Sequence, residues 1–151
     1  MSSLCIQPTI PAMTPAEIGK VARLESEMMR MEQVPIKTTH HFHAGMYART
    51  ICIPAGVMIT GVKIKRETVL IVSGHTTVYI GERAIEIRGY EVIPASAGRK
   101  QVFLAHADTD LTMLFATEAT TVEQAEEEFT DETELLMSRK CSGNSVVLKG
   151  E

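Results

Sequence analysis

The sequence predicts a mainly β protein, a jelly-roll barrel of about eight strands with one helix before the barrel and one after it. Between about Ile36 and Phe115 the chain consists of short runs rich in Val, Ile, Thr and Tyr. Gly, Pro and other turn residues separate these runs at intervals near ten, which is typical of a sandwich or barrel. Capping-box patterns at residues 14–17 and 120–123 mark helix starts on either side of this zone.

Residues 1–35 are predicted to form an N-terminal arm and one helix, packed on or between barrels. Thr14 is the expected N-cap, and Pro35 ends the helix after about residue 33. An apolar stripe at spacings of three and four runs along this helix, formed by Val21, Leu24, Met28 and Met31. The stripe is expected to lie in the core, and the alternative is a contact with another copy of the protein.

Residues 36–118 are predicted to form the barrel. The eight candidate strands are 47–53, 58–66, 68–73, 76–80, 84–87, 90–93, 100–105 and 111–116. The turns between them are expected at 54–56, 73–74, 81–82, 89 and 94–98, where Gly, Pro and Ser gather. This number of strands and this spacing fit a jelly roll.

Residues 119–139 are predicted to form the second helix, and residues 140–151 a tail. One helical face carries Val122, Ala125, Phe129 and Leu136, whereas residues 126–128, all glutamate, are expected on the solvated face. The tail is expected to be either frayed or a short edge strand over 145–148. The whole chain is expected to fold as one structural domain.

Composition excludes several classes of function. With 151 residues the chain is about one domain, and its net charge of −4 does not favour binding to a nucleic acid polymer. No apolar run reaches the length of a membrane span, and the first residues lack a secretion signal, so we expect a cytoplasmic protein without a membrane partner. Cys5, Cys52 and Cys141 are odd in number and far apart, which favours free thiols.

Two stretches resemble a known family. Residues 89–98, GYEVIPASAG, contain the glycine, proline and glycine of the second cupin motif, with one extra residue between Pro94 and Gly98. The run HHFHAGMYARTICIPAG, followed by ITG, PASAGRKQ and AHADT, is similar to small cupin-like proteins of bacteriophages and prophages. This resemblance covers about residues 39–131. It implies a double-stranded β-helix with a small-molecule pocket at its mouth, and a host cytoplasmic location if the chain is phage-encoded.

The metal-binding motif of that family is degenerate in this sequence. Alignment of the flanking glycines puts Ile64 and Arg66 where the two motif histidines belong, Leu70 near the motif glutamate, and Gln101 near the second-motif histidine. A guanidinium has no lone pair to donate and the two aliphatic side chains have no ligand atom. We therefore expect no metal in the barrel and no cofactor.

A histidine cluster offers an alternative metal site. His41 and His43 share one face of an extended segment and His40 lies on the other, so two imidazoles could bind one ion if a third ligand came from elsewhere. The sequence shows no such ligand. The simpler interpretation is an edge strand with Phe42 packed inward and the imidazoles at the surface or in hydrogen bonds.

A ligand site is predicted from the polar residues expected on the inner face of the barrel. Alternation along residues 47–53 puts Tyr47 and Arg49 on one face. If Arg49 and Arg66 point inward, their guanidinium groups require anionic partners, which a bound carboxylate or phosphate could supply. The alternative is that both arginines pair with carboxylates of this chain or face solvent. The predicted ligand-binding set is Tyr47, Arg49, Arg66, Gln101, Phe103 and His106.

These observations favour a non-catalytic module that binds or sequesters a small anionic metabolite or nucleotide. No catalytic residues are assigned, because no nucleophile occurs in a recognisable context. Three alternatives remain: a structural or assembly protein, for example of a phage; a cupin isomerase or epimerase that uses His106 and Tyr47; and a metal-dependent cupin with unusual ligands. The resemblance also implies a homo-oligomer.

Overall fold

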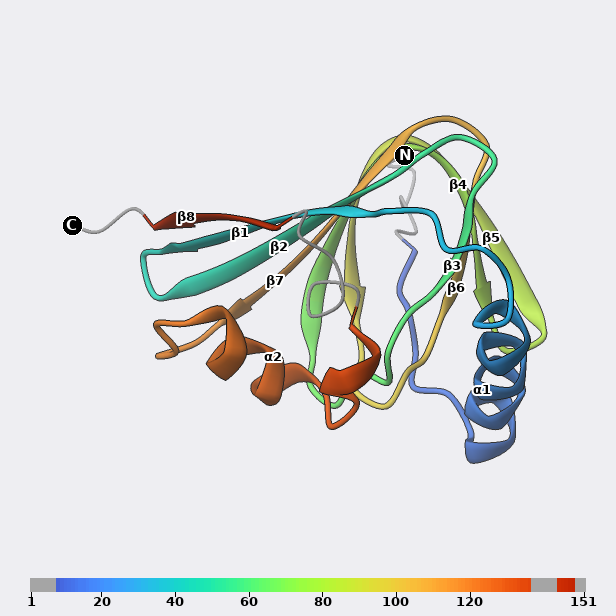
Figure 1. Ribbon diagram of the computed structural model, residues 1–151, viewed down its shortest axis with the longest axis horizontal. Helices are drawn as coiled ribbons and strands as arrows, with labels where there is room; N and C mark the ends of the chain where they lie inside the picture. The colour runs from blue at the N-terminus through green and yellow to red at the C-terminus, as the bar shows by residue number, and fades with distance from the viewer. Residues whose placement is uncertain (1–7, 137–143, 149–151) are drawn as a thin grey trace, which may run out of the picture.

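The computed structural model describes residues 8–136 and the backbone of residues 144–148. The predicted class is confirmed, because eight strands form a single curled sheet, with one α-helix before the first strand and one between the seventh and the eighth strand (Figure 1). The predictions that concern Cys5, Cys141 and residues 137–143 lie outside the described residues. Neither α-helix of the described part has the length and apolar character needed to cross a lipid bilayer.

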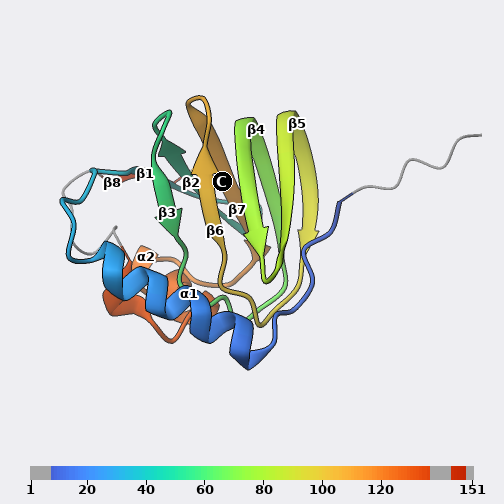
Figure 2. The same cartoon turned by 90° about the vertical axis from the view of Figure 1, so that its right-hand side faces the viewer.

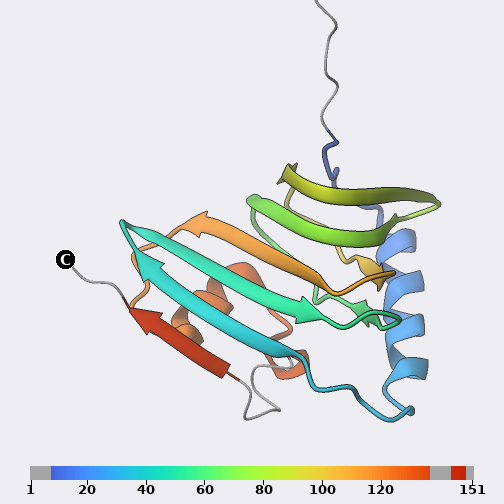
Figure 3. The same ribbon diagram turned by 90° about the horizontal axis from the view of Figure 1, so that it is seen from above.

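The sheet has the strand order β3-β6-β4-β7-β2-β1-β8, and β5 pairs with β4. The strands are β1 (Lys37–His43), β2 (Met46–Ile53), β3 (Met58–Thr60), β4 (Thr68–Ile80), β5 (Arg83–Ala95), β6 (Val102–Ala105), β7 (Thr109–Ala116) and β8 (Asn144–Leu148). All pairs are antiparallel except β1 with β8. Seen from above, β8, β1, β2 and β7 form one half and curve into β4 and β5 (Figure 3).

The curl of the sheet is centred on Gly74. Residues 69–73 of β4 pair with β7, whereas residues 76–79 pair with β6, so β4 changes partner at this point. A Cβ at Gly74 would lie 2.7 Å from the carbonyl oxygen of Asp108, which only glycine allows. The turns predicted at 73–74 and 89 are therefore wrong. Gly74 pairs with Gly89 inside two continuous thirteen-residue strands.

Helix α1 (Pro15–Met28) begins with the predicted capping box, in which the Thr14 hydroxyl accepts from the Glu17 N–H and the Glu17 carboxylate accepts from the Thr14 N–H. It passes below the lower ends of β3, β6 and β4 (Figure 2), with Glu17 next to Gly81 after β4 and Glu25 bonded to Thr60 of β3. It ends about five residues before the predicted end. The predicted core stripe is wrong for much of its length, because Val21 is buried whereas Met31 is 68% exposed.

Helix α2 (Val122–Phe129) lies beneath the sheet, capped at its N-terminus by the Thr121 hydroxyl (Figure 1). It is shorter than predicted, since the backbone becomes extended at Thr130 and continues into the 3-10 helix η1 (Thr133–Leu135). The predicted apolar face is largely correct: Ala125, Phe129 and Leu136 are buried. The expectation of a solvated acidic face is wrong for Glu126, which is 1% exposed.

A buried lysine joins both helical regions to the barrel. Lys100 is fully buried, and its Nζ lies 3.1 Å from a Glu25 carboxylate oxygen on α1 and 2.9 Å from Glu132 Oε1 beyond α2. Its backbone N–H donates to the sulfur of Met13, which is also buried. The segment between Gly98 and β6 therefore connects the sheet to both helical regions.

Candidate functional site

The curled sheet and the C-terminal helical segment border a partly open cavity of about 150 Å³. Most of its wall is apolar and includes Ile64, Leu70, Phe103, Leu111, Met113 and Phe129. Leu135 and Leu136 extend this wall beyond α2. The polar side chains that reach the cavity are Thr38, Arg49, Thr60, Arg99 and Gln101. A cavity with few polar groups on an apolar wall is typical of small-molecule sites.

Arg99 places a buried positive charge at the cavity wall. It is 1% exposed, and its guanidinium donates to Gln101 Oε1 (3.2 Å), the Ser96 carbonyl (2.6 Å), the Arg66 carbonyl (3.4 Å) and Thr68 Oγ1 (2.7 Å). All four acceptors are uncharged. Among residues 8–136 no carboxylate forms an ion pair with this arginine. Burial lowers the pKa of Arg99 to about 10, so the group is still a cation at neutral pH.

Two buried polar groups at the cavity wall have no hydrogen-bond partner within the described residues. They are the side-chain nitrogen Nε2 of Gln101 and the hydroxyl of Thr38. The orientation of the Gln101 amide follows from Arg99, because the guanidinium requires an acceptor and therefore faces the amide oxygen. The NH2 group is left to donate elsewhere. A buried donor without a partner costs about 1–3 kcal/mol, which a ligand acceptor could recover.

Arg49 lies at the cavity wall, a direction that the sequence left open, and its charge is compensated by a carboxylate of the same chain. Its Nη1 lies 3.1 Å from Glu126 Oε2, and the two side chains are 10% and 1% exposed. The guanidinium carbon also lies 5.6 Å from the centre of the Phe129 ring. The alternative of internal pairing, which the sequence left open, describes Arg49 in this structure.

Arg66 is also paired internally. Its Nη1 lies 3.3 Å from Glu128 Oε1, and its guanidinium stacks over the Phe115 ring at 4.1 Å. Both side chains of this pair are about one third exposed. Arg66 is not among the residues that line the cavity, whereas Ile64, Leu70 and Gln101, the other three positions aligned with the cupin metal motif, all line it.

Tyr47 belongs to an aromatic cluster behind the cavity. It is fully buried, its hydroxyl lies 2.7 Å from His40 Nδ1, and its ring packs against Phe42 and Phe115. Burial raises the pKa of the Tyr47 phenol above its ordinary value of 10.0, although the nearby Arg49 opposes this shift. Phe42 points inward from β1, as the simpler interpretation of the histidine cluster had it, and His40 is buried on the same face in its hydrogen bond with Tyr47. The expectation of an edge strand is wrong for β1, because β8 pairs with it.

His106 lies far from Tyr47, on the outer surface of the sheet. Its Nε2 is 2.7 Å from the Thr77 hydroxyl, and its ring lies beside that of His75. Ile53 at the end of β2 pairs with Thr109, so Tyr47 is six residues further along the strand, which is about 20 Å. The two residues named for an isomerase therefore do not face each other across the cavity.

Of the six predicted ligand-binding residues, the structure brings Arg49, Gln101 and Phe103 to one cavity. Sequence reasoning missed Arg99 and Thr38. Arg99 could have been found, because in an extended segment it shares a face with Gln101 two residues later. For Thr38, nothing in the sequence pattern indicated a position at the cavity wall.

No protein-family model matches the sequence, and no curated protein matches it. Among solved structures, the chain is similar to ectoine synthase from P. lautus, at 17% identity over 66% of this chain and 76% of that chain, with a TM-score of 0.48. It is similar to a cupin-2 domain from Rhodospirillum rubrum, at 15% identity over 60% and 68% of the two chains, with a TM-score of 0.46. It is also similar to a cupin-2 domain-containing protein from Shewanella frigidimarina, at 10% identity over 62% of this chain and 91% of that chain, with a TM-score of 0.42.

These similarities concern the fold and carry no activity to this chain. The assignment of the fold rests on the strand order and register of the sheet itself. The chain is a mainly β protein whose curled sheet is of the jelly-roll class, with a helix from each end packed against it, and cupin-2 domains are among the solved structures to which it is similar.

Proposed function

We propose that this protein binds a small carboxylate-bearing molecule, with an apolar body, in the cavity beneath the sheet. The observation that carries this proposal is the unpartnered Nε2 of Gln101 next to the guanidinium of Arg99, whose partners among residues 8–136 are all uncharged. A ligand carboxylate supplies both what the amide lacks, an acceptor, and what the arginine lacks, a negative charge.

The cavity volume limits the size of the ligand. About 150 Å³ is the size of an engineered protein cavity that holds one benzene molecule. A nucleotide, with its base, sugar and phosphate, is too large to enter whole. The proposal therefore keeps the predicted small anionic metabolite and drops the predicted nucleotide. The apolar wall around Leu70, Phe103 and Met113 favours a compact hydrocarbon body behind the carboxylate.

A titration with simple monocarboxylates, from acetate to benzoate, tests the proposal. Binding is followed by NMR of the methyl groups of Leu70, Leu111 and Met113, and by thermal unfolding. Benzoate is expected to shift these methyl signals and to raise the melting temperature, whereas benzyl alcohol, which has the same ring without the charge, is expected to bind about tenfold more weakly.

The variant Gln101→Glu separates charge recognition from simple cavity filling. Glutamate keeps an acceptor for Arg99 but adds a negative charge where the ligand carboxylate would sit, so benzoate binding is expected to be lost while the fold persists. Gln124→Glu is the matched control, because Gln124 is exposed and its Oε1 also accepts a hydrogen bond, from the Thr120 N–H. Equal benzoate affinity in both variants would contradict the proposal, as would equal affinity for benzyl alcohol and benzoate.

The non-catalytic role, the homo-oligomer and the phage-type resemblance stay predictions from the sequence. The isomerase alternative required His106 and Tyr47 to face one pocket, and neither residue lines the cavity. An assembly role has one observation in its favour: Met29, Met31 and Val34, at and after the end of α1, are 43–68% exposed.

A further inference from the structure

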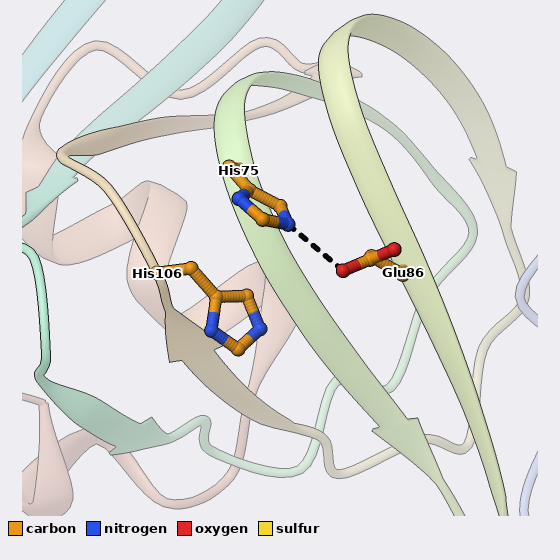
Figure 4. A group of neighbouring side chains, drawn as sticks. All are labelled: His75, Glu86 and His106. Carbon is orange, nitrogen blue, oxygen red and sulfur yellow. Dashed lines mark hydrogen bonds and ion pairs between the residues drawn. The ribbon is translucent and has the colours of Figure 1, made fainter.

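A second cluster of chemically active side chains lies on the outer face of the sheet, away from the cavity. His75 of β4, Glu86 of β5 and His106 just after β6 lie side by side, and each offers one potential ligand atom (Figure 4). These three atoms lie within 4.8 Å of one another. His75 is partly buried, and the other two side chains are exposed. None of the three belongs to the positions where the cupin resemblance implies a metal.

The sheet itself holds the three residues together. In the register of β4 with β5, Thr77 lies opposite Glu86, so His75 is the diagonal neighbour of Glu86 on the same face. On the other side, the His106 N–H donates to the His75 carbonyl at 2.8 Å, which continues the pairing of β4 with β6. The backbone thus fixes the three side chains, from neighbouring strands, on one face of the sheet.

The side chains of His75, Glu86 and His106 are already in contact with one another. His75 Nε2 lies 2.9 Å from Glu86 Oε2, and the two imidazole rings are 4.6 Å apart between centroids. Arg88 contacts the other carboxylate oxygen, at 3.6 Å, and its side chain is 73% exposed.

The geometry points to a binding site for one divalent transition-metal ion at His75, Glu86 and His106. Two imidazoles and one carboxylate form a donor set that suits Zn²⁺ and its neighbours rather than Ca²⁺ or Mg²⁺. Ligand atoms around a tetrahedral Zn²⁺ lie about 3.4 Å apart, given metal–ligand distances near 2.1 Å. Metal binding therefore requires the side chains to rotate until the ligand atoms, now within 4.8 Å of one another, reach this spacing. Three protein ligands leave a fourth position open to water or to a solute.

Zinc binding by the full chain, freed of any purification tag and of bound metal, tests this inference. Equilibrium dialysis and calorimetry at pH 7.5 are expected to give one Zn²⁺ per chain. His75→Ala and His106→Ala are each expected to weaken binding by about tenfold or more, and Glu86→Gln by less, since the amide keeps an oxygen donor. Thermal unfolding of each variant without metal shows that the fold is retained.

The control is the double variant His41→Ala/His43→Ala, which removes the two exposed histidines of the HHFH segment and is expected to leave zinc binding unchanged. Co²⁺ substitution provides a second readout, because ligation by nitrogen and oxygen gives d–d bands without a thiolate charge-transfer band. The inference is overturned by any one of three results: no saturable binding below about 1 mM Zn²⁺, loss of binding in the control but not in His106→Ala, or a thiolate band in the Co²⁺ spectrum.

Discussion

The ion pair between Arg49 and Glu126 provides the sharpest test of how α2 is held beneath the sheet. Glu126→Gln keeps the shape of the side chain and removes its charge, which leaves the guanidinium of Arg49 buried without this carboxylate. The side chains are 10% and 1% exposed and the atoms are 3.1 Å apart, so this is a buried pair. Loss of one partner from such a pair costs about 3–5 kcal/mol, and the retained amide oxygen puts our expectation near the lower figure.

The same helix carries the matched control. Glu128 pairs with Arg66 at 3.3 Å, but these side chains are 37% and 33% exposed, so Glu128→Gln is expected to cost about 0–1 kcal/mol. Urea unfolding at pH 7 measures both free energies, and the Glu126 variant should also melt about 6–12 °C lower than the wild type. Similar costs for the two variants would refute the argument that burial makes the first pair different.

The double variant Arg49→Met/Glu126→Leu tests whether the uncompensated charge on Arg49 causes the loss of stability. Removal of both charges leaves no uncompensated ion in the interior, so most of the lost stability is expected to return. If the double variant were as unstable as Glu126→Gln, the cost would come from lost packing around α2 and not from the charge on Arg49.

Two further predictions concern the curl of the sheet and the attachment of its ends. Gly74→Ala is expected to cost roughly 2–5 kcal/mol in urea unfolding, because its Cβ would lie 2.7 Å from the Asp108 carbonyl oxygen; Gly61→Ala, with its closest contact at 3.6 Å, should stay within about 1 kcal/mol of the wild type. For Glu132, burial raises the carboxyl pKa, but hydrogen bonds from a backbone N–H and from Lys100 outweigh it and hold the pKa below 4.5. The ionised carboxylate therefore stabilises the fold above pH 4.5, and the stability deficit of Glu132→Gln at pH 7 should disappear as the pH falls through the lowered pKa.

The class of fold could be predicted from the sequence, because turn residues and β-branched runs are local signals. The wrong turn predictions came from two glycines within the sheet. Gly74 and Gly89 were interpreted as turns, whereas they pair with each other in the middle of β4 and β5, and Gly74 also lets the backbone at Asp108 approach closely. Local composition cannot separate these two uses of glycine, since the close approach to Asp108 depends on a strand more than thirty residues away.

The site was predictable only where alternation along one strand decides it. Alternation along residues 47–53 put Arg49 on one face with Tyr47, and Gln101 was selected by its alignment with the second cupin motif; alternation around Gln101 would have added Arg99. The partner of Arg49 could not be found in this way, because Glu126 lies 77 residues away on a helix that looked acidic and solvated. The anionic ligand was first inferred from Arg49 and Arg66, and both of these charges are met within the chain.

Comparison of the buried and half-buried cations shows which of them has no carboxylate partner among the described residues. Lys100 lies between two glutamates, and Arg49 and Arg66 each have one. Arg99 differs from these three, because within residues 8–136 only uncharged groups accept its hydrogen bonds. An apolar interior penalises an uncompensated charge, and an anion that entered the cavity would relieve this penalty without competing with an internal carboxylate. Recognition of the ligand should therefore depend on Arg99 and the adjacent Gln101.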